Sequence, residues 1–257
     1  SLVGSEMCIR DRSAGGSAIG DVEYQKAYEK IFQPLKTREI EALNEMILAM
    51  RVVALGKSKK NKNLLHPGGL TPEQHQAWLD QRKKADPKSF KKLEGFAKMY
   101  FNAMEEQLVQ LRDAGLISEK LFQEMKNAGD YSPRRYIQFF DPDIKSDELE
   151  AITTGSTQAL EQDAALLMKD YMLRLHSRIA KNKANVELYN IAKENKDNGI
   201  VEIIGDEDKV ADNFEPVTAM IDGKKHRMKM PLQYGRDWMK SDPVLSANAA
   251  KFFRNIT

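Results

Sequence analysis

The feature that most constrains the fold of this chain is a long apolar stripe between Ser156 and Asn195. Apolar residues recur there about every 3.6 residues, and Asn182 is the one polar residue on the stripe. The apolar members are Ala164, Met168, Tyr171, Leu175, Ile179, Val186 and Tyr189. This spacing predicts a single helix, roughly 60 Å long at 1.5 Å per residue. A helix of that length must cover its apolar side, so we expect it to pack along several shorter helices or against another chain.

Shorter helical patterns fill the first half of the chain. Val22–Phe32 and Leu35–Leu55 predict two helices, or one helix broken at Pro34, because proline lacks the backbone N–H that a helix interior needs. Ser13–Gly20 is small and rich in glycine, which predicts a flexible lead-in. Gly56 is expected to end the second helix.

Helix-starting residues predict where the next helices begin. Thr71-Pro72-Glu73-Gln74 has a threonine cap, proline at the first helical position and glutamine at the third. Asp86-Pro87 starts a longer helix in the same way, which Gly115 should end in a left-handed conformation. Ser118 is expected to cap a further short helix. The apolar stripe predicted for the longer helix consists of Phe96, Tyr100, Met104, Leu108 and Leu111.

The last quarter of the chain predicts β structure. Asp222-Gly223 lies between two segments of alternating apolar residues, Val217–Ile221 and His226–Met230, and this pattern is typical of a tight hairpin turn. Ile200–Ile204 predicts a further short strand. The sequence therefore predicts a mostly α fold, an elongated helical bundle with one long helix and a small β-hairpin subdomain.

We expect four consecutive segments. Residues 1–20 form the lead-in, 21–130 a helical region, 131–196 an extended step followed by the long helix, and 197–257 the hairpin with C-terminal helices. Ser1–Arg12 resembles translated sequencing-adapter read-through and lacks the charged start and apolar core of a signal peptide. Phe252–Thr257 is an apolar, helix-like run without a cap. Both ends are therefore expected to be cut from a longer protein.

Composition and motifs narrow the classes of function. The 257 residues include 40 Lys and Arg against 38 Asp and Glu, a net charge of +2, and no apolar run is long enough to span a membrane. Gly56-Lys57-Ser58 lacks the preceding glycine and strand of a phosphate-binding loop. Neither the acidic segment that follows Asp141 nor the one that follows Asp206 has the ligand spacing of a calcium loop. We therefore predict no catalytic, cofactor-binding or metal-binding residue and no cofactor.

Charge is unevenly distributed along the chain. Lys57–Lys92 holds ten basic and three acidic residues, Asp141–Asp170 is acidic, and Arg174–Lys196 is again basic. Such blocks can contact nucleic-acid phosphates, pair with one another, or solvate helix faces. If they bind nucleic acid or a partner, the candidate contacts are Lys57, Lys59, Lys60, Lys62, Arg134, Arg135, Arg178 and Lys181.

A succession of short motifs resembles a known family. The motifs are Gly69–Glu73, Leu111–Ile117 (LRDAGLI), Tyr131–Arg135, Arg178–Lys183 and Val217–Leu232. In this order they resemble the large polyvalent-protein-associated domain, type thirty-eight, of phage and mobile-element polyvalent proteins. The resemblance covers about residues 64–257. Ser132 departs from it, because a β-branched residue is usual there, and the acidic insert at 141–150 is less typical.

The resemblance implies a function without established chemistry. It implies a non-catalytic helical segment with a scaffold or assembly role in an internal or ejected virion protein, located in the virion or the host cytoplasm. Its partners would be other segments of the parent protein or other virion proteins, or a second copy bound through the long helix. Two alternatives stay open, a nucleic-acid-binding module and an accessory domain of a larger enzyme that lies outside this fragment.

Overall fold

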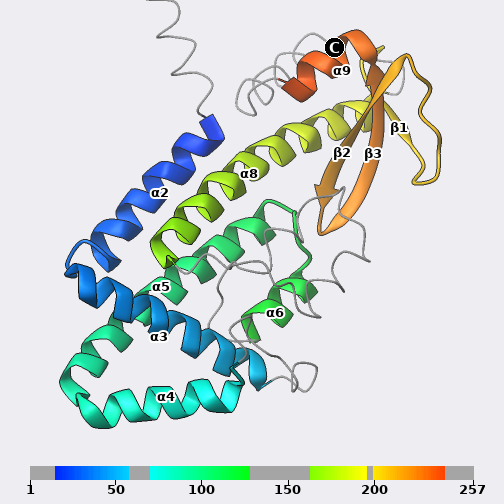
Figure 1. Cartoon of the computed structure of the whole chain (residues 1–257). Coiled ribbons are helices and arrows are strands. Elements are labelled where there is room, and N and C mark those ends of the chain that lie inside the picture. Colours follow the sequence, from blue (N-terminus) through cyan, green and yellow to red (C-terminus); the bar gives the residue numbers. More distant parts are fainter. Residues whose placement is uncertain (1–14, 58–69, 128–162, 196–198, 241–257) are drawn as a thin grey trace, which may run out of the picture. The chain divides into compact units, whose positions relative to one another are not determined.

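The computed structural model describes residues 15–57, 70–127, 163–195 and 199–240 (Figure 1). Within these ranges the chain is mostly helical with one small antiparallel sheet, which confirms the predicted fold class. The helices are α2 (Gly15–Ile31), α3 (Thr37–Gly56), α4 (Pro72–Ala85), α5 (Pro87–Asp113), α6 (Glu119–Asn127), α8 (Ala164–Glu194) and α9 (Leu232–Lys240). The strands are β1 (Glu202–Ile204), β2 (Phe214–Ile221) and β3 (Lys224–Pro231).

Some predicted features lie outside the described residues. They are the adapter-like start at 1–12, the extended step at 131–135, the acidic insert at 141–150, the first residues of the long helix at 156–162 and the apolar run at 252–257. None of the helices in the described ranges combines the length and the apolar character that crossing a bilayer requires.

The chain divides into two compact units, each built from segments that are distant in sequence. Unit 1 contains residues 1–22, 109–119 and 172–257, and unit 2 contains residues 23–108 and 120–171. Helices α2, α5 and α8 each contribute residues to both units. This division differs from the four consecutive segments predicted, because long helices bring together parts of the chain that local patterns treat as separate.

Unit 1 is built around a sheet with strand order β1-β3-β2, and both pairings are antiparallel. Asp222 and Gly223 have φ values of 50° and 69°, as the predicted tight turn requires. The sheet packs on the C-terminal part of α8 together with α9 (Figure 1). The buried cluster between these elements consists of Ala184, Leu188, Ile191, Ala192, Val201, Val217, Ala219, Met228, Met230 and Trp238.

The prediction of a flexible lead-in over Ser13–Gly20 was wrong from Gly15 onward, where α2 begins. Figure 1 shows the first turns of α2 alongside α8. A methyl group added at Gly16 would lie 2.7 Å from the Ser177 Cα, and one at Gly20 would lie 2.5 Å from the Met172 carbonyl oxygen. Glycine is needed at these positions because the two helix backbones approach so closely. Composition alone had indicated flexibility where the glycines serve packing.

Unit 2 packs α3, α4 and most of α5 around an apolar core. Its most deeply buried side chains include Phe32, Leu43, Tyr100, Met104 and Leu108. The rings of Phe32 and Tyr100 meet edge to face, with centroids 6.5 Å apart. Tyr100, Met104 and Leu108 belong to the stripe predicted on α5. The structure confirms four of its five members as buried, since Leu111 is also buried, whereas Phe96 is only partly buried.

Helix boundaries follow the predicted start and stop residues closely. Thr71 Oγ1 accepts the Gln74 N–H at 3.3 Å, and Gln74 Oε1 accepts the Thr71 N–H at 2.8 Å, which completes the capping box that starts α4. Asp86 Oδ1 accepts the Ser89 N–H at 2.9 Å at the start of α5. Gly115, with φ of 73°, follows the end of α5 as predicted.

Candidate functional site

The first candidate site is a polar cluster on α8, formed by the buried residues Asn182 and Asn185, with Asn182 at its centre. This residue, the polar member of the predicted stripe, is 4% exposed. Its Nδ2 donates to the carbonyl oxygens of Ala114 and Met220, both at 2.8 Å, and its Oδ1 accepts the Met220 N–H at 2.7 Å. Asn182 thereby joins three parts of unit 1: α8, the residue that follows α5, and β2.

Asn185 continues the cluster one turn along α8. Its Nδ2 donates to the Thr218 carbonyl oxygen at 2.8 Å, and its Oδ1 accepts the Trp238 Nε1–H at 2.9 Å. Lys181 Nζ donates to the Trp238 carbonyl oxygen at 2.6 Å and lies 5.8 Å from the centre of the Trp238 ring. The buried polar groups of α8 therefore hold both β2 and α9.

The cluster also closes an edge of the sheet. Strand β2 is an outer strand, so backbone groups on the side away from β3 need other partners. Asn182 and Asn185 supply them for Met220 and Thr218. Pro216, two residues earlier, has no N–H to satisfy. These side chains therefore bind the backbone of an edge strand that would otherwise be open to another chain.

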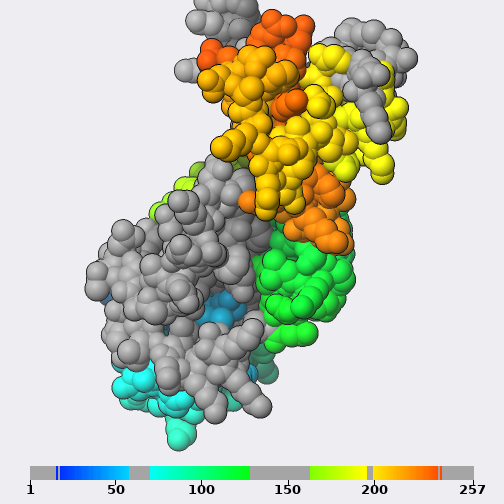
Figure 2. Space-filling model, turned by 90° about the vertical axis from the view of Figure 1, so that its right-hand side faces the viewer, coloured from blue at the N-terminus to red at the C-terminus, as the bar shows by residue number. Residues whose placement is uncertain are grey.

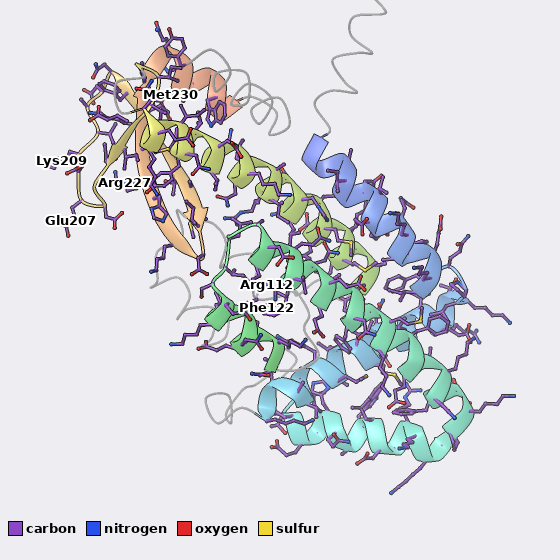
Figure 3. The ribbon with its side chains drawn as sticks, turned by 180° about the vertical axis from the view of Figure 1, so that it is seen from behind. Arg112, Phe122, Glu207, Lys209, Arg227 and Met230 are labelled. Atoms are coloured by element: carbon purple, nitrogen blue, oxygen red, sulfur yellow. The ribbon has the colours of Figure 1, made fainter. Side chains whose placement is uncertain are left out.

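The acidic loop between β1 and β2 is tied to the central strand. The Arg227 guanidinium donates to the carbonyl oxygens of Gly205, at 3.0 Å, and Asp206. Asp208 Oδ2 accepts the Gly205 N–H at 2.6 Å. Figure 3 shows Arg227 beside the loop that carries Glu207 and Lys209. Within the described ranges, no three His, Cys, Asp or Glu side chains come together as a metal-binding group.

The described candidate contacts predicted from the sequence belong to different units. Lys57 is exposed and belongs to unit 2, whereas Arg178 and Lys181 belong to unit 1. Lys181 was predicted as a nucleic-acid or partner contact, but its ammonium group is bound within the fold to the Trp238 backbone. The other five candidates lie outside the described residues: Lys59, Lys60, Lys62, Arg134 and Arg135.

A basic surface on unit 2 is the second candidate site. We define it by six residues in the last turn of α4 and the first two turns of α5, namely Arg82, Lys83, Lys84, Lys88, Lys91 and Lys92. All six are exposed, and α4 forms part of the molecular surface seen in Figure 2. They lie in the second half of the predicted basic block, although none was named as a contact.

Two members of the basic surface are paired with carboxylates. Arg82 lies 3.3 Å from Glu45, and Lys92 lies 2.6 Å from Glu39. The pKa of Glu39 is held below its usual value, first by the Lys36 backbone N–H that it accepts at 3.0 Å and then by Lys92. Lys83, Lys84, Lys88 and Lys91 form no ion pair with any residue that the structure describes.

Comparison of the chain with protein-family models, with curated proteins and with solved structures finds no match. The resemblance to the polyvalent-protein domain therefore stays a prediction from the sequence motifs.

The sequence had missed most of the buried cluster. It placed Asn182 on the apolar stripe but did not identify its partners, nor did it single out Asn185 and Trp238. Two asparagines three residues apart on the buried side of a long helix were the available signal, since buried amides need hydrogen-bond partners.

Proposed function

We propose that this chain is a non-catalytic structural segment of a phage or mobile-element polyvalent protein. In this role it would hold other segments of the parent protein, or other virion proteins, in a defined arrangement. The observation that carries the proposal is the pair of buried asparagines on α8, Asn182 and Asn185, whose amides bind the backbone of separate segments. The order of motifs described above supports the phage or mobile-element origin.

The buried hydrogen bonds favour a mechanical role because they resist separation of the segments they join. If β2 moved away from α8, the Met220 N–H and C=O and the Thr218 C=O would each lose a partner. Each intramolecular hydrogen bond contributes about 0.5–1.5 kcal/mol net relative to water, so opening the three together is costly. A segment that transmits force or fixes spacing in an assembly needs such a joint.

The proposal is tested by following the chain into assembled particles. Quantitative mass spectrometry of purified particles is expected to detect this segment at a fixed ratio to the major structural proteins. Asn182→Leu in the parent gene should lower that ratio, whereas Asn190→Ala, on the same helix, should leave it unchanged. Absence of the wild-type segment from purified particles would overturn the proposal.

A further inference from the structure

We infer that the basic surface of unit 2 is a binding site for the phosphate backbone of double-stranded nucleic acid. This function goes beyond the structural role proposed above. The local charge is strongly positive, because residues 81–92 contain six basic residues and a single acidic one, Asp86. The carboxylate of Asp86 accepts the Ser89 N–H and so serves as the cap of α5.

The junction of α4 and α5 carries four lysines whose ammonium groups form no ion pair with a described residue. Lys83 and Lys84 lie in the last turn of α4, and Lys88 and Lys91 lie in the first two turns of α5. Only Asp86 separates the two helices, so the four lysines fall within nine consecutive residues at the junction of α4 and α5. On α5, Lys88 and Lys91 are three residues apart and share a helix face, about 5–6 Å apart at Cβ.

The paired members of the surface have a different role. Arg82 is held between Glu45 and the ring of Trp78, whose centre lies 5.1 Å from the guanidinium carbon. Lys92 is held by Glu39 at the start of α3. These contacts link α4 and α5 to α3 and position the helices that carry the four lysines. The four lysines that form no ion pair are therefore distinct from Arg82 and Lys92, whose ion pairs hold the helices in place.

The chemistry of the surface favours a duplex over a membrane. A membrane-binding helix needs large apolar side chains beside its basic ones. The exposed large apolar residues of the described chain, such as Leu70 and Met99, fall outside residues 81–92. A duplex carries one negative charge per roughly 1.7 Å of its axis, so a surface two helical turns wide faces several phosphates. Lysine, a compact and strongly hydrated charge, suits such contacts without reading bases.

The salt dependence of duplex binding reports how many phosphates the surface contacts. If each of the four lysines neutralises one phosphate, the logarithm of the binding constant should fall with the logarithm of the salt concentration with a slope of about 3–4. The experiment measures fluorescence anisotropy of a labelled 20-base-pair duplex of mixed sequence, titrated with the full chain at about 50 and about 200 mM salt. We expect binding at the lower concentration and the stated slope.

A matched pair of variants locates the site. Changing Lys83, Lys84, Lys88 and Lys91 to Gln should weaken binding at least about tenfold at low salt and abolish most of the slope, since each lost phosphate contact removes about one unit. The control changes four exposed lysines of unit 1 to Gln and removes the same net charge: Lys183, Lys193, Lys209 and Lys224. The control should bind as the wild type does, and unchanged thermal melting should show that both variants are folded.

Three outcomes would overturn the inference. The first is no binding of the wild type at about 50 mM salt. The second is an equal loss in the two variants, which would indicate only a general effect of net charge. The third is tighter binding to polyglutamate, or to vesicles of anionic phospholipid, than to the duplex in parallel titrations.

Discussion

The buried asparagines of unit 1 and the helix caps of unit 2 find their hydrogen-bond partners in different ways. In unit 1, Asn182 and Asn185 are buried and bind groups 33 to 68 residues away in the sequence. In unit 2, Thr71 and Asp86 cap α4 and α5 through exposed hydrogen bonds to backbone groups three residues away. The buried asparagines of unit 1 therefore depend on distant partners, whereas the starts of α4 and α5 in unit 2 are satisfied locally. The start of α8 in unit 2 is an exception, because Asn44 Oδ1 accepts the Ala164 N–H at 3.1 Å from 120 residues away. Substitutions in each unit can test this difference separately.

The largest effect is expected at the centre of the unit 1 cluster. Asn182→Leu keeps a similar volume but leaves the Ala114 C=O and the Met220 N–H and C=O without the amide. We expect a loss of about 3 kcal/mol in the free energy of unfolding, measured by chemical denaturation. Hydrogen exchange of the Met220 amide should also become faster.

The control for this prediction lies on the same helix. Asn190 is partly buried, and its change to alanine should alter stability by no more than about 0.5 kcal/mol. If Asn182→Leu were as mild as Asn190→Ala, the cluster would not be the joint of unit 1.

A second test compares one substitution at two glycines. In Gly20→Ala the added methyl would lie 2.5 Å from the Met172 carbonyl oxygen of α8, so the helices must move apart. We expect a cost of about 2 kcal/mol, in the range found for overpacked interiors. Gly95→Ala on α5 has no atom within 4 Å of the new methyl and should stabilise by about 0.5–1 kcal/mol. Thermal melting of both variants should give shifts of opposite sign.

A third test addresses the local capping of unit 2. Thr71→Ala removes the oxygen that accepts the Gln74 N–H, and loss of such a cap costs about 1 kcal/mol. Thr37→Ala is the matched control, because Thr37 is exposed at the first position of α3 and is not its cap. Urea denaturation should separate the two variants, and an equal cost in both would argue against the role of the capping box.

The smallest effect is a pH dependence in unit 2. Burial lowers the pKa of His75, on α4, below its usual value of 6.5. The unfolded chain therefore takes up a proton at a higher pH than the folded one, so stability should decrease as the pH falls below about 6.5. The expected decrease is a fraction of the roughly 1.4 kcal/mol per pH unit that one proton can supply.

This dependence is measured by denaturation at about pH 7.5 and about pH 5.5. His75→Gln should lower stability at both values, and its stability should fall less between them than that of the wild type. An identical fall in the two proteins would show that other groups cause the acid sensitivity.

The sequence by itself determined the elements whose causes are local. A threonine cap with proline and glutamine at fixed spacing starts α4, and Asp222-Gly223 makes the hairpin turn. The apolar spacing sets most of the buried face of α5 and that of α8 as far as Asn182. Beyond Asn182 the prediction was less accurate, because Val186 and Tyr189 are only partly buried while Ala184, Leu188 and Ile191 are buried. These features depend on a few neighbouring residues and on the period of a helix or strand. For that reason they could be predicted without knowledge of the fold.

Only the tertiary structure decided which distant residues those elements bring together. Taken alone, the glycines at 16 and 20 predict flexibility. In the structure they lie in the first turns of α2, where they allow the backbone of α8 to approach closely. Asn182 needed partners, but nothing in its neighbourhood indicates Ala114 or Met220. Lys181 and Lys88 carry the same charge, so their sequence does not distinguish them. Only the fold places the Trp238 carbonyl oxygen where Lys181 Nζ can donate to it. Long-range packing and the saturation of buried hydrogen bonds are properties of the assembled chain, so no local pattern encodes them.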